Sequence, residues 1–168
     1  LLRAIALLKA RGLPAKGAIV GDGVALPGLR ALAVELGVEE DVVFPGRVSQ
    51  SEALDWYGAL DAFVIPRVPT EVTRTVTPMK GVQAMALGVP LVVSDLPALV
   101  EVAASQGQGL VVPPDNPEAL ADALNLLVED ETLCRHLSEA GRLAAADRTW
   151  SAAGKRYLQI YQALLAGR

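Results

Sequence analysis

The residues best placed to do chemistry are three cations in an irregular stretch between Pro66 and Lys80. Arg67, Arg74 and Lys80 stand there with one acid, Glu71, although the chain as a whole carries a net charge of −4. Cations gathered on an acidic protein favour an anionic ligand. The alternative is a solvated loop whose charges have no ligand.

The helix expected directly after this stretch adds a second attraction for an anion. Thr77 is placed to cap it, and Pro78 stands at the first helical position. Free backbone N–H groups and the helix dipole favour negative charge at such an end. Lys80 in the first turn opposes the dipole, and a bound diphosphate would account for that lysine.

Glycines and polar residues follow several short apolar runs. The sequences at these points are Gly21-Asp22-Gly23, Gly46-Arg47-Val48, Pro66-Arg67 and Ser94-Asp95. In an open parallel sheet, ligands collect at the carboxyl ends of the strands. We therefore expect the site along this edge, although each glycine taken singly is better explained by a tight turn.

Short Val-rich runs alternate with helical patterns along the chain, which is typical of βα units. We predict one domain over residues 1–168: an α/β fold with a Rossmann-like open parallel sheet and helices on both faces. Ser49 and Glu52 have capping-box spacing at the start of one helix. The chain opens inside a helical pattern, so we expect the first strand ahead of Leu1, in a longer protein.

Composition excludes several other classes. The hydrophobic share of 52% is carried by Ala, Leu and Val. The apolar stretch from Leu60 to Ile65 is interrupted by Asp61 and is far shorter than a membrane span. The acidic balance disfavours nucleic-acid binding. Cys134 and His136 are the only residues of their types, which disfavours zinc. We expect a cytoplasmic protein, with peripheral contact at a membrane in the full-length form.

The last three helical patterns carry apolar stripes. We predict that these stripes join the core. The stripes are Leu120, Leu124 and Leu127, then Leu133, Leu137 and Leu143, then Tyr157, Ile160, Tyr161 and Leu164.

Taken together, six segments resemble the C-terminal, donor-binding domain of family 4 retaining glycosyltransferases, which is one half of the GT-B fold. They are Ile19-Val-Gly-Asp-Gly23, Val43-Phe-Pro-Gly-Arg-Val48, Tyr57-Gly-Ala-Leu-Asp-Ala-Phe-Val-Ile-Pro66, Gln83-Ala-Met-Ala-Leu-Gly-Val-Pro90, Val93-Ser-Asp95 and Gly109-Leu-Val-Val-Pro-Pro-Asp115. The closing stretch from Trp150 to Tyr161 resembles the family's final helix. The match covers nearly the whole chain in order.

The resemblance implies a nucleotide-diphosphate sugar over the strand ends and an acceptor held by a separate N-terminal domain. Arg47 and Val48 are then candidates to contact the base. Thr77, the N–H of Met79 and Lys80 are candidates for the diphosphate and sugar. The final helix reaches back to the other domain in this family. The resemblance therefore implies that part of the face between Tyr157 and Leu165 is bare in this chain and prone to self-association.

Two positions depart from the family's pattern. The glutamate that binds the ribose hydroxyls is Gln83 here, and Thr75 stands where a second glutamate is expected. Gln83 can still accept a hydroxyl through its amide oxygen, but without charge, and charged hydrogen bonds are roughly twice as strong as neutral ones. Glu71 is a candidate to replace the missing acid.

The sequence-based hypothesis is transfer of a sugar from a nucleotide-diphosphate sugar with retention of configuration, without a metal or other cofactor. The fragment alone is expected to be inactive. Two alternatives stay open. One is a glycosyltransferase-like partner or regulatory subunit that has lost the donor site, as Gln83 and Thr75 suggest. The other is a sugar-nucleotide epimerase of the same fold.

Overall fold

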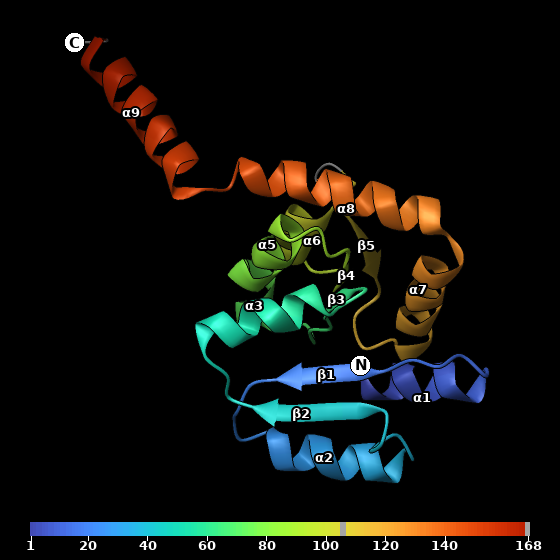
Figure 1. Cartoon of the computed structure of the whole chain (residues 1–168). Coiled ribbons are helices and arrows are strands. Elements are labelled where there is room, and N and C mark those ends of the chain that lie inside the picture. The colour runs from blue at the N-terminus through green and yellow to red at the C-terminus, as the bar shows by residue number, and fades with distance from the viewer. Residues whose placement is uncertain (105–106, 167–168) are drawn as a thin grey trace.

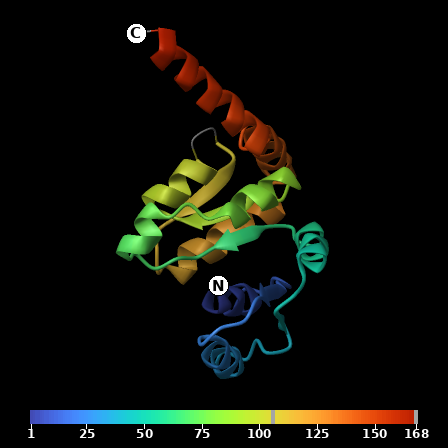
Figure 2. The ribbon, with the colours of Figure 1, turned by 90° about the vertical axis from the view of Figure 1, so that its left-hand side faces the viewer.

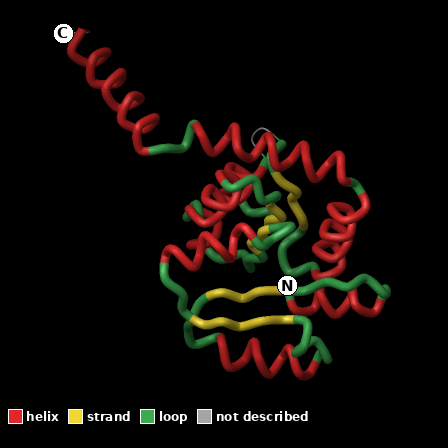
Figure 3. The backbone as a smooth tube through the Cα atoms, viewed as in Figure 1, coloured by secondary structure: helices red, strands yellow, loops and turns green. Residues whose placement is uncertain are grey.

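Helices and short strands alternate through the computed structural model, which describes residues 1–104 and 107–166 (Figures 1 and 3). The elements are, in order, α1 (Leu2–Ala10), β1 (Gly17–Val20), α2 (Leu26–Glu35), β2 (Val42–Gly46), α3 (Gln50–Gly58), β3 (Phe63–Ile65), α4 (Glu71–Thr75), α5 (Met79–Ala86), β4 (Leu91–Ser94), α6 (Pro97–Ala103), β5 (Gly109–Val112), α7 (Pro117–Glu129), α8 (Glu131–Ala146) and α9 (Trp150–Ala166). Within these ranges no helix combines the length and apolarity needed to cross a membrane.

The strands are all parallel, as predicted, but they form two sheets. β1 pairs with β2, in a register that sets Gly17 opposite Val42 and slips before Val20. β3, β4 and β5 form the second sheet, in that order. The predicted α/β class is confirmed, and the sheet predicted as one is hydrogen-bonded in two parts.

Helices cover both faces of the three-stranded sheet, and the central strand shows why. Side chains along a strand point alternately to opposite faces. Leu91 and Val93 of β4 pack in one core cluster, whereas Val92 between them belongs to another. All three are fully buried. This double burial explains why the strand is a continuous apolar run.

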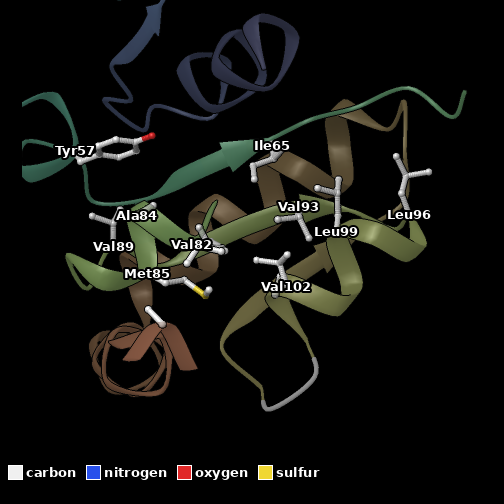
Figure 4. Packing of buried hydrophobic residues seen from close by; sticks show 13 residues of the cluster. Tyr57, Ile65, Val82, Ala84, Met85, Val89, Val93, Leu96, Leu99 and Val102 are labelled. Atoms are coloured by element: carbon white, nitrogen blue, oxygen red, sulfur yellow. The ribbon is translucent and has the colours of Figure 1, made fainter. Parts of the chain in front are cut away.

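One face of this sheet is covered by α5 and α6, with α8 behind α5 (Figure 4). Met85 of α5 is fully buried at its centre, next to Val82 and Val102. Gly141 lets α8 approach closely, because a Cβ there would already lie 3.5 Å from Met85. The other face is covered by α1 and α7, which pack side by side.

The predicted core role of the last helices is right for α7 and in part for α8, and wrong for α9. Leu120, Leu127 and Leu137 are buried, but Leu143 is 73% exposed. α9 buries none of its residues and projects away from the rest of the molecule (Figures 1 and 2). Apolar residues at helical spacing indicate that a helix has an apolar face, but they do not show which surface that face packs against. The described residues of this domain do not bury any residue of α9.

Candidate functional site

The loops that follow β1 and β2 are joined to each other. The N–H of Gly21 donates to the carbonyl of Gly46 at 2.8 Å, and the two glycines have φ values of 143° and 78°. Other residues rarely adopt such angles. Asp22 accepts a hydrogen bond from the N–H of Gly23 at 2.7 Å. The first predicted group is therefore a backbone turn, formed by Gly21, Asp22 and Gly23. It lies beside Gly46, where the loop after β2 begins.

The loop after β2 is fixed by the predicted capping box. Ser49 Oγ accepts from the N–H of Glu52 at 3.2 Å, and the Glu52 carboxylate accepts from the N–H of Ser49 at 2.8 Å. These hydrogen bonds hold the pKa of Glu52 below its usual value. Immediately before the box, Arg47 is exposed and Val48 is half-buried, so both have restrained backbones and accessible side chains.

After β3, the irregular stretch is fixed at its start by a buried serine. Ser94, 3% exposed at the carboxyl end of β4, accepts a hydrogen bond from the backbone N–H of Arg67 at 2.9 Å. The Arg67 guanidinium donates to the carbonyl of Val76 at 3.3 Å. Arg67 therefore closes the loop on itself, a role that its charge alone did not indicate.

The middle of this stretch is a helical turn, α4, where no helix was predicted. Thr70 caps it, since its Oγ1 accepts from the N–H of Thr73 at 3.1 Å, and Thr73 Oγ1 returns a contact by accepting from the N–H of Thr70. Glu71 and Arg74 are exposed on this turn. Thr75 Oγ1 donates to the carbonyl of Glu71 at 3.0 Å, so Thr75 is engaged within α4.

The start of α5 differs from the prediction. Pro78 is the N-cap residue, not the first helical residue, and no side chain caps the helix. The predicted cap by Thr77 is therefore wrong. Proline fixes φ near the extended value of −81° observed here, and the helix begins only at Met79. Met79 and Lys80 are exposed in its first turn.

Gln83 lies further along α5 and is held from α3. The hydroxyl of Tyr57 donates to Gln83 Oε1 at 3.4 Å. Tyr57 is 8% exposed, and its ring centroid lies 5.2 Å from that of Phe63. Burial raises the pKa of Tyr57, so the hydroxyl remains a donor at neutral pH.

Tyr57 and Ser94 were missed as functional residues by sequence reasoning. Ser94 was placed at a strand end but given no role, and Tyr57 was named only as the start of a segment that resembles the family. The signal available for Ser94 was a polar residue that ends a run of buried apolar ones, Leu91-Val-Val-Ser94. For Tyr57 no pattern indicated contact with Gln83, which lies 26 residues away.

The predicted residues thus fall into two groups along the carboxyl ends of the strands. One comprises Gly21, Asp22, Gly23, Arg47 and Val48, and the other comprises Arg67, Glu71, Arg74, Thr77, Met79, Lys80 and Gln83. Within the described ranges, no hydrogen bond or ion pair joins the two groups. In the same ranges the charged ends of Arg74 and Lys80 form no ion pair with the protein.

Two further observations concern the described residues. A shallow hollow on α3 is lined by Glu52, Asp55, Trp56 and Ala59, none of which belongs to the predicted set. No three His, Cys, Asp or Glu side chains gather in the described ranges in a way that could hold a metal ion.

Comparison with known families identifies the class. Residues 1–144 match the model of glycosyl transferases group 1. The chain belongs to this family.

Several curated relatives are glycosyltransferases whose names include an inositol compound. D-inositol 3-phosphate glycosyltransferase of Streptomyces griseus is 29% identical over 175 residues, covering 99% of this chain and 36% of that protein. Phosphatidyl-myo-inositol mannosyltransferase of Mycobacterium leprae is 30% identical over 126 residues, covering 75% of this chain and 33% of that protein. The chain spans about a third of the length of these relatives.

Solved structures show the same fold as half of a larger architecture. HepE of Anabaena, solved in complex with UDP, superimposes with a TM-score of 0.81 at 20% identity, covering 99% of this chain and 44% of that one. Sucrose-phosphate synthase of Thermosynechococcus elongatus gives 0.77 at 23% identity, covering 99% and 43%. These neighbours are GT-B glycosyltransferases, so the predicted half of a GT-B architecture is confirmed.

Proposed function

We propose that this chain is the donor-binding half of a retaining, family 4 glycosyltransferase that transfers a sugar from a nucleotide-diphosphate sugar. The observation that carries the proposal is the start of α5: no side chain caps it, and Lys80 and Arg74 form no ion pair among the described residues. A diphosphate would complete both the helix end and the cations.

In this proposal each predicted group has a separate role. The N–H of Met79 and the Lys80 ammonium bind the diphosphate, with Arg74 from α4 as a second cation. Arg67 keeps the loop closed through Val76 and contributes positive potential from there. Thr77 shapes the approach to Pro78 and leaves the first N–H groups of α5 accessible.

The nucleoside lies toward the other residues of the edge. Gln83 accepts a ribose hydroxyl with the lone pair of Oε1 that Tyr57 leaves free. Arg47 and Val48 contact the base. The backbone turn at Gly21, Asp22 and Gly23 brings main chain close to the ligand without side-chain bulk, which is the use that glycine best serves.

The reaction breaks the bond between the anomeric carbon and the diphosphate and forms one to an acceptor oxygen, with retention of configuration. Charge develops on the departing diphosphate, so preorganised N–H groups and cations act where they are most effective. We propose that these groups serve without a divalent ion. In the full-length protein, transfer that persists in excess chelator supports this, and loss of transfer contradicts it.

We assign the acceptor to chain outside these 168 residues, because the chain covers only 36% of the D-inositol 3-phosphate glycosyltransferase of Streptomyces griseus. We propose that α9 packs against that second domain in the full-length protein. Its exposed residues include Tyr157, Tyr161 and Leu164, at 61%, 59% and 66%. In the fragment this face is available for self-association.

The test is a thermal-shift panel with UDP, GDP, ADP and their common sugar conjugates, on this chain and on the full-length protein. A ligand at about 100 times its Kd stabilises the folded state by roughly 2.7 kcal/mol. At about 2–4 °C per kcal/mol for a domain of this size, Tm rises by about 5–11 °C. UDP is the first candidate, since HepE was solved with it.

Matched variants decide whether a shift comes from the proposed site. Lys80→Ala should lose most of the shift, whereas Lys155→Ala, an exposed lysine on α9, should keep it. A shift unchanged in Lys80→Ala contradicts the proposed diphosphate contact. No shift with any nucleotide on the full-length protein contradicts donor binding altogether.

One observation favours a second candidate, a family member that has lost catalysis. Thr75, where a second acid was expected, is engaged within α4 through the carbonyl of Glu71, and Gln83 is uncharged. Product analysis with the full-length protein separates the cases: sugar transferred to an acceptor supports the transferase, an epimerised sugar nucleotide supports an epimerase, and no turnover despite nucleotide binding supports the non-catalytic relative.

A further inference from the structure

Four apolar side chains are exposed within the stretch that joins β3 to α5. Val68, Val72, Val76 and Met79 are 57%, 65%, 50% and 60% exposed. Single exposed apolar residues are normal on a protein surface, but a group of them indicates a place where a ligand or partner binds. This group lies in residues 68–79, at and directly ahead of the proposed diphosphate contacts, and the proposed function assigns no role to these side chains.

Hydrogen bonds hold the three valines of this group in one compact loop. The Arg67 guanidinium donates to the carbonyl of Val76 at 3.3 Å, and the hydroxyl of Thr73 donates to the carbonyl of Val68 at 2.7 Å. The N–H of Val76 donates to the carbonyl of Val72 at 2.9 Å. The path of the backbone therefore fixes the three valines relative to one another, although each remains at least half exposed.

Hydroxyl groups of the same stretch are used within it. Thr70 Oγ1 accepts from the N–H of Thr73 at 3.1 Å, Thr73 donates its hydroxyl proton to the carbonyl of Val68, and Thr75 Oγ1 donates to the carbonyl of Glu71 at 3.0 Å. A hydroxyl has only one proton to donate. A ligand beside α4 therefore finds the protons of Thr73 and Thr75 already engaged, whereas the valine methyl groups are open to it.

The proposed diphosphate contacts determine which part of the donor lies beside this loop. In the proposed function the nucleoside lies toward Gln83 and Arg47, and the diphosphate binds at the N–H of Met79 and at Lys80. The sugar is bonded to the far end of the diphosphate, so it extends away from Gln83, toward the residues that precede Met79. Val76 is three residues before Met79, and three residues of chain span at most about 11 Å. The sugar therefore lies beside Val76 in this arrangement.

Valine methyl groups favour a methyl group on the sugar over a hydroxyl. A hydroxyl placed against them loses its hydrogen bonds to water and gains none from the valines. A methyl group at the same place removes apolar surface from water, both its own and that of the valines. One exposed acid, Glu71, remains on α4 to accept another hydroxyl of the sugar.

We infer that the donor sugar carries a methyl group that packs against Val76 and Val72, next to the Met79 side chain. The methyl group is that of a 6-deoxyhexose or that of an acetamido substituent, which are two sources of the same apolar contact. This inference rests on the proposed function and names the class of sugar that its donor site takes.

The test is isothermal titration of the full-length protein with three conjugates of one nucleotide, beside that nucleotide alone. For UDP, the conjugates are UDP-glucose, UDP-6-deoxyglucose and UDP-N-acetylglucosamine. At least one of the two methyl-bearing conjugates should bind roughly tenfold or more tightly than UDP-glucose, because one carbon group in an apolar pocket is worth about 10- to 200-fold. A preference for UDP-6-deoxyglucose assigns the contact to the sugar's C6, and a preference for UDP-N-acetylglucosamine assigns it to the acetamido group.

The outcomes separate this inference from the proposed function. If UDP binds, and UDP-glucose binds at least as tightly as both other conjugates, the inferred class of sugar is wrong while the donor site stands. If the nucleotide panel selects GDP, GDP-mannose and its 6-deoxy form, GDP-rhamnose, make the equivalent pair. If no nucleotide binds, the proposed function fails and the inference fails with it.

Matched variants locate the contact. Val76→Thr keeps the branched shape at Cβ and replaces one methyl group by a hydroxyl. It should remove most of the preference for the methyl-bearing conjugate and leave the Kd for UDP unchanged. Val128→Thr, 77% exposed on α7, is the control and should change neither value. A preference that stays unchanged in Val76→Thr and also in Val72→Thr overturns the inference.

Discussion

The hydroxyl of Tyr57 and the amide oxygen of Gln83 are 3.4 Å apart, joined by a hydrogen bond between α3 and α5. The bond joins two neighbouring βα units. Because Tyr57 is itself buried, its hydroxyl fixes the orientation of the Gln83 side chain. An amide oxygen has two lone pairs. The second lone pair is left for a ligand, which makes this pair the most direct place to test the proposed nucleotide site.

Replacing Gln83 by Glu should tighten nucleotide binding. The carboxylate can accept the Tyr57 hydroxyl as the amide does, and it adds charge to the contact with the ribose hydroxyls. Charged hydrogen bonds exceed neutral ones by about 1 kcal/mol, which corresponds to roughly fivefold in Kd. Isothermal titration of the full-length protein with UDP measures this change in Kd.

The control for added charge is Gln159→Glu, an exposed glutamine on α9. It should leave the Kd for UDP unchanged. Weaker binding in Gln83→Glu contradicts the prediction and would show that the amide is adapted to this donor.

Removing the hydroxyl of Ser94 should both destabilise the domain and weaken donor binding. Ser94→Ala leaves the N–H of Arg67 without its acceptor at the start of the loop, and an unsatisfied buried donor costs about 1–3 kcal/mol. Urea unfolding gives the free energy, and the Kd for UDP gives the effect on the loop. Ser151→Ala, exposed on α9, should change neither. An unchanged Kd in Ser94→Ala would show that the loop does not bind the donor.

The fold was predictable from the sequence because local signals and burial agree along most of the chain. Val92 and its neighbours form a continuous apolar run, and a fully covered parallel strand requires one. The Ser49–Glu52 box was found by spacing alone, since both partners lie within one turn. The division of the sheet was not predictable from composition or periodicity, because neither indicates which strands are neighbours.

The site was less predictable than the fold, because composition and periodicity do not indicate which residues far apart in the sequence are in contact. Arg67 was recognised by its charge, but its contact with the Val76 carbonyl depends on the path of α4, which no periodic pattern marks in five residues. The cap expected from Thr77 failed because Pro78 moved the helix start by one residue. Leu143 has the helical spacing of a core residue but is 73% exposed. Spacing on a helix therefore does not show whether another element packs against that position.

Adding a methyl group at Gly109 should destabilise the domain, whereas the same change at Gly28 should not. A Cβ at Gly109 would lie 3.0 Å from Ala103 Cβ and 3.1 Å from the Ala103 carbonyl oxygen, which is backbone. Overpacking of this kind costs about 1–3 kcal/mol. At Gly28 of α2 a Cβ meets open space, and alanine is the better helix former by up to about 1 kcal/mol. Urea unfolding of the two variants should therefore give changes of opposite sign.

Asp41 should contribute pH-dependent stability through its two lysines. Lys16 Nζ lies 2.7 Å and Lys9 Nζ 2.8 Å from its carboxylate oxygens. The hydrogen bond from Lys16, then that from Lys9, lowers the pKa of Asp41 from 3.8. The contact with Asp41 raises the pKa of Lys9 above 10.5.

The sign of the effect follows from these shifts. Asp41 stabilises the fold above pH 3.8, and this contribution is lost as the pH falls through its lowered pKa. The contribution of Lys9 is present below pH 10.5 and is lost as the pH rises through its raised pKa. Asp41→Asn should therefore lower Tm most at neutral pH and least at either extreme, and less in high salt. Asp61→Asn is the exposed control, and a Tm difference that is constant with pH contradicts the assignment.

Deleting α9 should leave the stability of the domain unchanged and abolish self-association. None of its residues is buried, and Trp150 is 92% exposed, so a chain ending at Thr149 loses no core contact. Its unfolding free energy should lie within about 0.5 kcal/mol of that of the 168-residue chain, measured at a concentration where both are monomeric. Sedimentation velocity over a concentration series should show association of the longer chain and none of the shorter. A large loss of stability on deletion would show that α9 packs on this domain in solution. Association that persists without α9 would place the contact between copies on another surface.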